Sequence, residues 1–489
     1  MATSSPQSEA LYRQIAARLR DDIASGRRAA GERLPTIRAL ASELGVNRDT
    51  VALAYEALAG EGLVESTVGR GTFVRAEVAA EAGSAALEPR LAPTVQRLQD
   101  FARARPRYAS TDAVPLHALL PDPSLYPVDE FRRALNRVLA DEGAELLRYG
   151  GPQGHAGLRE VLAAHLRETG AHVTPDALAL TQGATEGITL ALRLFAEPGD
   201  AVAVEEPTYH NVLGTLIALR LQPVPIPMRG GAPDLGVLAR ALDRPEVKLF
   251  YTMPTFHNPL GTSTPVEHRR ELLTVAARAG KPIVEDAYEM DLRYAGKPVP
   301  PLAALDRSGL VVQLFSFSKS LFPGARVGSI HARGRLVDAL LALKQATDLG
   351  GALAFQAALA RFVADGGYDR HLGRLRRVLR ARRDALLDAL ARELPDATWT
   401  EPEGGHQIWL ELPGGVDTRD LLPEAARAGV LFAPGSQFHH DGRPSSGLRL
   451  SIAAADEAAI RRGVAALGRA VREHGARGRS APRSVSVHV

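Results

Sequence analysis

The most constraining feature of the sequence is a series of short apolar runs, each ending in a polar cluster and followed by a stretch of helical character. Five such runs occur, at residues 177–181, 200–205, 247–254, 282–284 and 309–315. Strands that alternate with helices in this way predict an α/β domain with a large, mostly parallel sheet. Ligands bind such sheets at the carboxyl ends of the strands, so we expect the polar clusters to form one site.

The cluster after the last run contains Lys319, in the segment Ser-Phe-Ser-Lys at residues 316–319. A lysine that can lose its proton beside other cations can form a Schiff base with an aldehyde cofactor. The alternative is a lysine at a strand end whose amine reaches solvent, which is the commoner role of such residues. Lys319 alone does not decide between the two.

The other clusters supply the groups that pyridoxal phosphate requires. Asp286 could keep the pyridine nitrogen protonated. Asn258 and Tyr288 could donate to the phenolate oxygen, and Tyr209 could stack on the ring. The phosphate needs a helix N-terminus with hydroxyls and an arginine, for which the candidates are Gly183, Ala184, Thr185, Ser316, Ser318 and Arg326. Each residue alone could be a helix cap, a turn residue or a surface charge, but their common order and spacing favour the cofactor.

Residues 115–470 resemble a fold-type I aminotransferase, which has this large sheet and a small C-terminal α/β domain. The resemblance rests on five motifs: Tyr-Gly-Gly-Pro-Gln-Gly-His-Ala-Gly-Leu-Arg (149–159), His-Asn-Pro-Leu-Gly-Thr (257–262), Glu-Asp-Ala-Tyr (285–288), Ser-Phe-Ser-Lys (316–319) and Gly-Leu-Arg-Leu-Ser (447–451). It implies that Lys319 carries the cofactor and that Asp286 and Tyr288 share the catalytic role. It also implies that Arg449 binds the α-carboxylate of the substrate. Tyr149 would reach the cofactor phosphate of the neighbouring subunit in a homodimer.

The first part of the chain predicts a winged helix-turn-helix. Apolar residues at four-residue steps indicate a helix over residues 11–23, and a second helix is expected over residues 36–44. Asn47 is a suitable N-cap for a third helix. Two β-type runs then flank the Gly-Arg-Gly turn at residues 69–71, as in a wing.

Residues 9–75 resemble the GntR family of bacterial repressors, most clearly over residues 31–51 and 58–64 and in Gly-Arg-Gly-Thr-Phe-Val at 69–74. The resemblance implies binding to a double-stranded DNA operator through Arg38, Asn47, Arg48, Thr50 and Arg70. Side chains at the start of the recognition helix meet base edges or phosphates. A module for protein interaction is the alternative, because ten arginines stand against only nine acidic residues in residues 1–75.

The predicted organisation has four parts: the DNA-binding domain at 9–75, a mobile linker at 76–110 with a helix near 94–104, an aminotransferase-like domain at 111–472 and a disordered tail at 474–489. This combination resembles the MocR branch of the GntR family. It implies a regulator of transcription that senses an amino acid or amine by forming an external aldimine with pyridoxal phosphate.

Two alternatives remain open for the second domain. The intact Asn-Pro-x-Gly motif at 258–261 leaves an active aminotransferase with an appended DNA-binding module possible. A dimerisation scaffold without a cofactor conflicts with the joint presence of Lys319, Asp286 and Asn258.

Composition excludes several other classes of function. The chain has no cysteine, which excludes disulfides, zinc thiolate sites and cysteine nucleophiles. The formal net charge is only +3, so no global basic field is present. No uncharged apolar run approaches the roughly 18 residues of a membrane span, and residues 1–9 lack the features of a signal peptide. We therefore expect a cytoplasmic protein with no membrane partner.

Histidines give no metal site in the sequence. His439 and His440 are adjacent but have no third ligand in view, so we predict no metal. His406 occupies a position near the substrate in this fold, and we favour a buried histidine with a hydrogen-bond partner over a ligand-selecting one.

Overall fold

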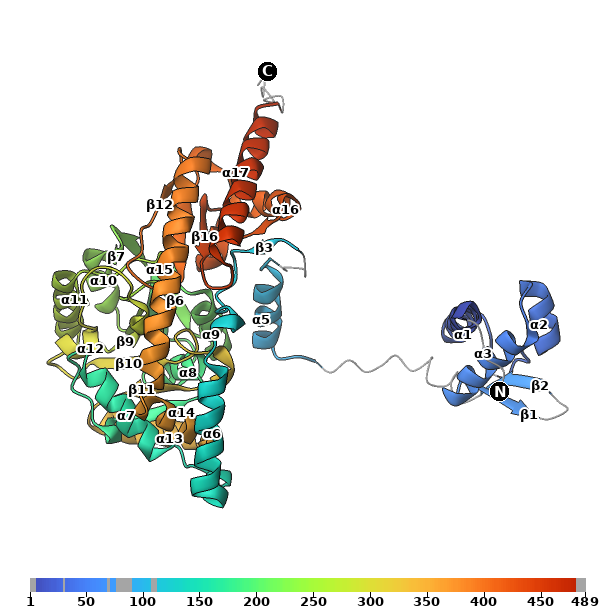
Figure 1. The fold of residues 1–489 in the computed structure, drawn as a ribbon, viewed down its shortest axis with the longest axis horizontal. Coiled ribbons are helices and arrows are strands. Elements are labelled where there is room, and N and C mark those ends of the chain that lie inside the picture. The colour runs from blue at the N-terminus through green and yellow to red at the C-terminus, as the bar shows by residue number, and fades with distance from the viewer. Residues whose placement is uncertain (1–5, 30, 68–70, 76–89, 107–111, 481–489) are drawn as a thin grey trace. The chain divides into compact units, whose positions relative to one another are not determined.

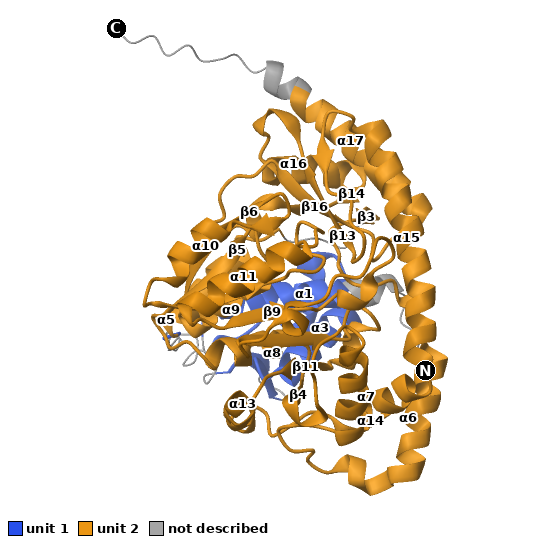
Figure 2. Ribbon diagram, turned by 90° about the vertical axis from the view of Figure 1, so that its left-hand side faces the viewer, with its two compact units in different colours: residues 1–91 blue, residues 92–489 orange. Residues whose placement is uncertain are grey.

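The computed structural model describes residues 6–29, 31–67, 71–75, 90–106 and 112–480. The chain forms two compact units, residues 1–91 and 92–489, each of which has its own hydrophobic core (Figures 1 and 2). Within the described residues, no helix combines the length and the apolar character that crossing a membrane requires.

The first unit is a winged helix-turn-helix, as predicted. Its elements are α1 (Pro6–Ala24), α2 (Ile37–Leu44), α3 (Arg48–Gly60), β1 (Val64–Thr67) and β2 (Gly71–Val74). Strands β1 and β2 pair in antiparallel fashion and form the wing. Of the apolar residues that predicted the first and third helices, all but Leu11, which is 37% exposed, are buried in one core: Ile15, Leu19, Ile23, Val51, Ala54, Tyr55 and Leu58.

Capping residues define where α2 and α3 begin and end. The Thr36 side chain accepts a hydrogen bond from the backbone N–H of Ala39, and α2 ends at Gly45 in the left-handed conformation. The Asn47 side chain accepts from the N–H of Asp49 and opens α3, the helix predicted to meet DNA. The short turn between the two helices is therefore encoded locally.

The second unit contains an eight-stranded sheet of order β4-β11-β10-β9-β8-β5-β6-β7. Its strands are β4 (Leu178–Thr181), β5 (Ala201–Glu206), β6 (Gln222–Arg229), β7 (Ala232–Pro233), β8 (Val247–Thr252), β9 (Ile283–Asp286), β10 (Val311–Ser316) and β11 (Gly328–His331). The five predicted runs are β4, β5, β8, β9 and β10. Strands β10, β9, β8, β5 and β6 run parallel to one another. Strand β11 is antiparallel to both β10 and β4, and β7 is antiparallel to β6.

Helices cover both faces of this sheet. Val311 and Phe315 of β10 belong to one core cluster, while Val312 and Leu314 belong to the other. The helices are α6 (Val128–Glu142), α7 (Ala156–Arg167), α8 (Ala184–Arg193), α9 (His210–Leu219), α10 (Leu235–Leu242), α11 (Val266–Ala279), α12 (Leu302–Leu305), α13 (Arg335–Gln345) and α14 (Leu353–Ala364). The fold is therefore the predicted α/β architecture with both sheet faces buried, as a parallel sheet requires.

A smaller C-terminal sheet completes the second unit. Its antiparallel strands, in the order β12-β13-β16-β15, are Thr398–Trp399, Gln407–Glu411, Gly447–Ser451 and Ala433–Pro434. Helices α16 (Thr418–Ala428) and α17 (Glu457–Ser480) pack on it, and the short strands β3 (Val114–Pro115) and β14 (Val430–Leu431) pair beside it. The long helix α15 (Gly367–Glu393) runs along one side of the unit and packs on both α14 and α17 (Figure 2).

The prediction of a disordered tail from residue 474 is wrong for its first part, because α17 continues to Ser480. The apolar face of this helix is buried through Ala470, and the turns that follow continue past Gly475 and Gly478. Residues 481–489 of the predicted tail lie outside the described residues.

The prediction of a mobile linker also needs correction in its second half. The helix expected near residues 94–104 exists as α5 (Pro93–Arg103), but it packs on α9 and belongs to the second unit. Phe101 lies against Gly214, where an added Cβ would come within 3.2 Å of the ring. Residues 76–89 and 107–111 of the linker lie outside the described residues.

A buried arginine fixes the loop that carries Asn258. Arg269 on α11 is fully buried and donates to the carbonyl oxygens of Thr264, Pro254 and Pro300. Burial lowers the pKa of its guanidinium to about 10, so the charge persists at neutral pH. One side chain therefore ties both ends of the 254–264 loop to α11.

We predict that Arg269→Met lowers the free energy of unfolding by about 3–5 kcal/mol, because each buried acceptor left without a donor costs about 1–3 kcal/mol. Urea unfolding measures the change. The matched control is Arg270→Met on the same helix, since the Arg270 side chain is 63% exposed. Equal stability of the two variants would contradict this role for Arg269.

Candidate cofactor and ligand site

A cavity of about 520 Å³ lies at the carboxyl ends of the strands of the large sheet. Most of the residues predicted from the sequence line it together: Ala184, Thr185, Tyr209, Asn258, Asp286, Tyr288, Ser316, Ser318, Lys319, Arg326 and Arg449. Gly183 adjoins the cavity as the N-cap of α8. Tyr149 does not line it, and its side chain is 87% exposed.

Asp286 is the last residue of β9 and is buried with one oxygen unsatisfied. The hydroxyl of Tyr251, on the neighbouring strand β8, donates to Oδ2 of Asp286 at 2.7 Å. Oδ1 has no hydrogen-bond partner among the described residues. Burial raises the pKa of Asp286 to about 7, against the lowering effect of the Tyr251 hydrogen bond. A cationic N–H directed at Oδ1 would both satisfy this oxygen and favour the carboxylate, as the pyridine nitrogen of pyridoxal phosphate would.

Lys319 lies in the segment that connects β10 to β11. Its amine donates to the carbonyl oxygen of Leu119 at 2.8 Å. Burial lowers the pKa of Lys319, and the charges of Arg449 and Arg326 act in the same direction, while Glu289 opposes them. These surroundings favour the neutral amine, the form that attacks an aldehyde.

Buried hydrogen bonds hold the segment that carries Lys319. The Tyr368 hydroxyl donates to Oδ2 of Asp291 at 2.6 Å and lies 2.6 Å from the hydroxyl of Ser320. Oδ1 of Asp291 is 2.9 Å from Nε2 of His165. This support fixes the residue next to Lys319.

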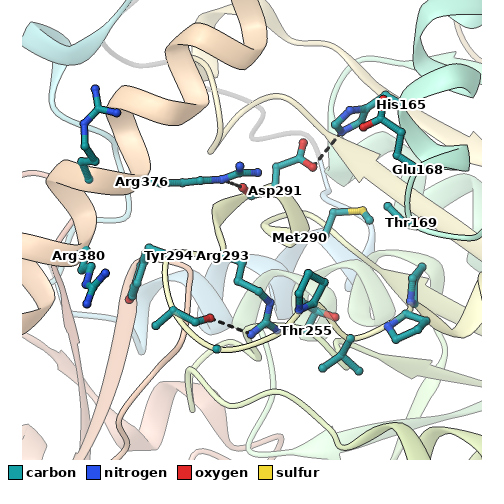
Figure 3. A pocket seen from close by; sticks show the side chains of 17 residues that line it. His165, Glu168, Thr169, Thr255, Met290, Asp291, Arg293, Tyr294, Arg376 and Arg380 are labelled. Carbon is teal, nitrogen blue, oxygen red and sulfur yellow. Dashed lines mark hydrogen bonds and ion pairs between the residues drawn. The ribbon is translucent and has the colours of Figure 1, made fainter.

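A second cavity, of about 640 Å³, is lined by Asp291, His165 and Met290 (Figure 3). Arg376 and Arg380 of α15 line it, together with Arg293 and Tyr294. None of the predicted site residues does so, and the chemistry therefore belongs to the cavity that contains Lys319.

The residues predicted to bind a phosphate lie around the N-terminus of α8. Gly183 has a φ of 84°, and an added Cβ there would lie 3.1 Å from the Arg326 guanidinium. Arg326 donates to the carbonyl oxygen of Gln182 at 2.6 Å. The hydroxyl of Ser316 is 3.1 Å from that of Ser318 and accepts from its backbone N–H at 3.2 Å. The N-terminus of α8, the hydroxyls and the guanidinium form a site suited to a phosphate, because the first backbone N–H groups of a helix have no partner within the helix.

Arg449 comes from β16 of the small sheet and meets the loop of the large domain. It donates to Oδ1 of Asn258 at 3.0 Å and to the carbonyl oxygen of His117 at 2.8 Å. The Tyr288 hydroxyl donates to the Phe256 carbonyl at 3.3 Å and accepts from the side-chain amide of Gln407. Arg449 is therefore held in a fixed orientation by two uncharged acceptors.

Tyr209 lines the same cavity and has its own support. Its hydroxyl accepts from the side-chain amide of Asn211 at 2.8 Å. Tyr209 lies in the segment after β5, and β5 is the neighbour of β8 in the sheet.

Sequence reasoning missed several residues that build this site. Tyr251 was not predicted as a site residue, because an aromatic residue in a β-type run is typical of a hydrophobic core. His117, His210 and Arg105 also line the cavity. Arg105 follows Phe101 by four residues, a helical spacing that places both on one face of the segment, yet the surrounding composition indicated a linker.

The histidines singled out in the sequence outside this cavity have carboxylate partners. His406 is fully buried with Nδ1 2.7 Å from Oε1 of Glu289 and does not line the cavity, in agreement with the favoured interpretation. Glu206, His440 and Asp441 have potential ligand atoms within 4.8 Å of one another. Arg443 already lies 3.0 Å from Oε1 of Glu206, so this acidic group has a counter-charge and we assign no metal.

The predicted DNA contacts divide into three groups. Arg38, Asn47 and Arg48 are exposed on the first unit. Thr50 is only 3% exposed, so the prediction that its side chain faces DNA is wrong: the first turn of α3 directs it into the core. Arg70 lies outside the described residues.

Comparison with known proteins gives two family matches. The model of "Aminotransferase class I and II" matches residues 119–467, and that of "Bacterial regulatory proteins, gntR family" matches residues 11–74.

Both a regulator and enzymes are among the similar proteins. The probable rhizopine catabolism regulatory protein MocR of Rhizobium meliloti is 30% identical over 94% of this chain and 93% of its own length. Aromatic-amino-acid aminotransferase 1 of Thermococcus litoralis is 34% identical over 74% of this chain and 89% of its own. The structure of kynurenine aminotransferase from Pyrococcus horikoshii, 31% identical, matches with a TM-score of 0.72 over 80% of this chain and 97% of that one.

The match to MocR spans 94% of this chain, whereas the match to aromatic-amino-acid aminotransferase 1 spans 74% of it. The family of the second unit and its structural neighbours imply dependence on pyridoxal phosphate. The chain belongs to the aminotransferase class I and II family and, through the gntR-type domain fused to it, to the MocR-type transcriptional regulators.

Proposed function

We propose that the chain binds operator DNA through its first unit and senses an amino acid or amine through pyridoxal phosphate held in its second. The observation that carries this proposal is the single cavity in which the amine of Lys319 and the open Oδ1 of Asp286 accompany Arg449. A chain with both this cavity and a winged helix-turn-helix has the parts of a ligand-responsive regulator. Operator binding would place it in the cytoplasm.

The cofactor would be held at each of its polar groups. Asp286 would accept from the ring nitrogen, and Asn258 and Tyr288 would face the phenolate oxygen. The phosphate would lie among Gly183, Ala184, Thr185, Ser316, Ser318 and Arg326, with the Tyr209 ring against the pyridine. Pyridoxal phosphate supplies an aldehyde that bonds to amines and a ring that withdraws electrons from the bound amine.

The residues of the chain would then recognise an amino acid at two points. The guanidinium fork of Arg449 matches the two oxygens of an α-carboxylate. Lys319 would yield its place to the ligand amine and could take up or return a proton there, because its pKa is lowered by burial. Burial of Asp286 keeps water from the ring nitrogen.

We further propose that the second unit forms a homodimer. The exposed Tyr149 ring lies outside the cavity of its own chain. An aromatic side chain exposed to this extent supports a contact with a second copy, in which Tyr149 would reach the phosphate of the partner's cofactor.

Transamination is the second candidate function. The joint presence of Lys319, Asp286 and Tyr288 supports it, since the same groups serve an enzyme or a sensor. It requires multiple turnovers of an amino acid to a keto acid when an acceptor is present. We rank regulation first because a DNA-binding unit has no evident use in a dedicated transaminase.

The experiment that separates these functions measures operator affinity while amino compounds are added. A regulator requires at least about a tenfold change in affinity with a compound that alters the absorbance of the bound cofactor, because a ligand with equal affinity for both arrangements shifts neither. Rapid multiple turnover together with unchanged operator affinity for every such compound would reverse the ranking.

We predict that Lys319→Ala abolishes the visible absorbance of the cofactor without unfolding the protein. Borohydride reduction followed by peptide mapping should find the cofactor on Lys319 in the unmodified chain. Lys297→Ala is the control, because Lys297 is exposed and lies outside the cavity. A normal visible spectrum in Lys319→Ala would refute the assignment.

We predict that Arg48→Ala weakens operator binding by about 1–3 kcal/mol if the side chain reads a base, or reduces the salt dependence by about one charge if it meets phosphate. Smaller losses are expected for Arg38→Ala and Arg70→Ala. The control is Arg20→Ala, because Glu61 already binds the Arg20 guanidinium at 2.6 and 2.8 Å. Unchanged affinity and salt slope would remove Arg48 from the interface.

A further inference from the structure

Arg105 lies two residues after the end of helix α5 and lines the same cavity as Lys319 and Arg449. Among the described residues, its guanidinium donates to two uncharged acceptors, the His210 carbonyl at 3.2 Å and the Asn211 side chain at 3.5 Å. Its Nε is buried without a hydrogen-bond partner among the described residues. The group also lies over the Phe101 ring at 4.4 Å, which holds it in place.

The charges that line the cavity do not balance. Arg105, Lys319, Arg326 and Arg449 are basic, whereas Asp286 is the one acidic residue of the lining. Under the proposed function, Asp286 pairs with the ring nitrogen, Arg326 with the phosphate and Arg449 with the α-carboxylate. Arg105 is then the cation of the lining for which no acidic group remains.

Three basic residues of the lining act electrostatically on one imidazole. The pKa of His210 is held well below its ordinary value by burial and by the charges of Arg105, Arg449 and Lys319. His210 is therefore neutral and occupies the region that these cations share. A ligand bonded near Lys319 and held by Arg449 would lie within the electrostatic reach of Arg105.

We propose that Arg105 receives a second carboxylate, so that the ligand is an amino acid with an acidic side chain. This inference rests on the proposed function and adds the class of ligand. Arginine suits the task because its planar fork binds a carboxylate through two parallel hydrogen bonds. An acidic ligand also supplies the negative charge that the cavity lacks.

The position of Arg105 gives this contact a regulatory consequence. Helix α5 has no buried residue, so its packing on α9 is shallow. Phe101 of α5 lies against Gly214, and Arg105, just after the helix, donates to His210 and Asn211. A carboxylate on Arg105 would fasten to the second unit the segment that leads to the DNA-binding unit. Ligands without this group would leave α5 as loosely held as before.

The test titrates cofactor-loaded full-length protein with glutamate and glutamine, which differ in charge at nearly constant shape, and measures both affinities by calorimetry. We expect glutamate to bind more tightly. Arg105→Gln should reduce the ratio of the two affinities by roughly 10- to 100-fold, the range for a hydrogen bond to a charged group. Arg103→Gln is the matched control, because Arg103 is exposed on the same helix and should leave the ratio unchanged.

Hydrogen exchange of the backbone of α5 provides a second readout. Glutamate should slow exchange over residues 93–103, and glutamine should not; Arg105→Gln should remove the difference. Aspartate with asparagine, and 2-aminoadipate with norleucine, extend the comparison to other side-chain lengths.

The outcomes separate this inference from the proposed function. If neutral amino acids change the cofactor absorbance as well as acidic ones do, and Arg105→Gln alters neither ratio nor exchange, the acidic subsite is wrong while the proposed function stands. If no amino compound changes the absorbance of the loaded protein, the proposed function is wrong and the subsite falls with it.

Discussion

The site depends on the burial of one half-satisfied carboxylate at the end of β9. Asp286 has Tyr251 on one oxygen and no described partner on the other. In a buried environment such an oxygen destabilises the charged form, which is why the pKa of Asp286 rises to about 7. A bound cation relieves that cost. The chain therefore carries, at the centre of its large sheet, a position suited to a protonated ring nitrogen.

The elements around Asp286 hold it and its neighbours in a fixed frame. Strands β8, β9 and β10 are parallel, so their carboxyl ends bring Tyr251, Asp286 and Lys319 to one edge of the sheet. Arg269 holds the loop with Asn258 through backbone carbonyls and the hydroxyl of Thr255. Such buried hydrogen bonds to charged groups rigidify a site, because breaking any of them leaves acceptors without donors.

The wall of the cavity on the side of α5 is less firmly packed than this frame. A helix without a buried residue contributes little apolar burial, and the contacts that hold it involve a cation with no acidic partner in the cavity lining. In the function we propose, the rigid side would bind the cofactor, and the shallow side belongs to the segment that leads to the DNA-binding unit. Differential contact with a ligand on that side is what coupling between two sites requires.

The sequence by itself determined the local elements and the chemistry of the site. The period-four apolar spacing predicted α1, and Asn47 predicted the start of α3. The five apolar runs predicted the strands after which Asp286 and Lys319 are placed. These features follow from interactions between near neighbours in the chain. Only the tertiary structure decided that Tyr251 supports Asp286, that Thr50 is buried and that Arg105 leaves the predicted linker to line the cavity. Those contacts join residues 35 or more positions apart, or depend on which face of a helix is covered, and no local pattern encodes them.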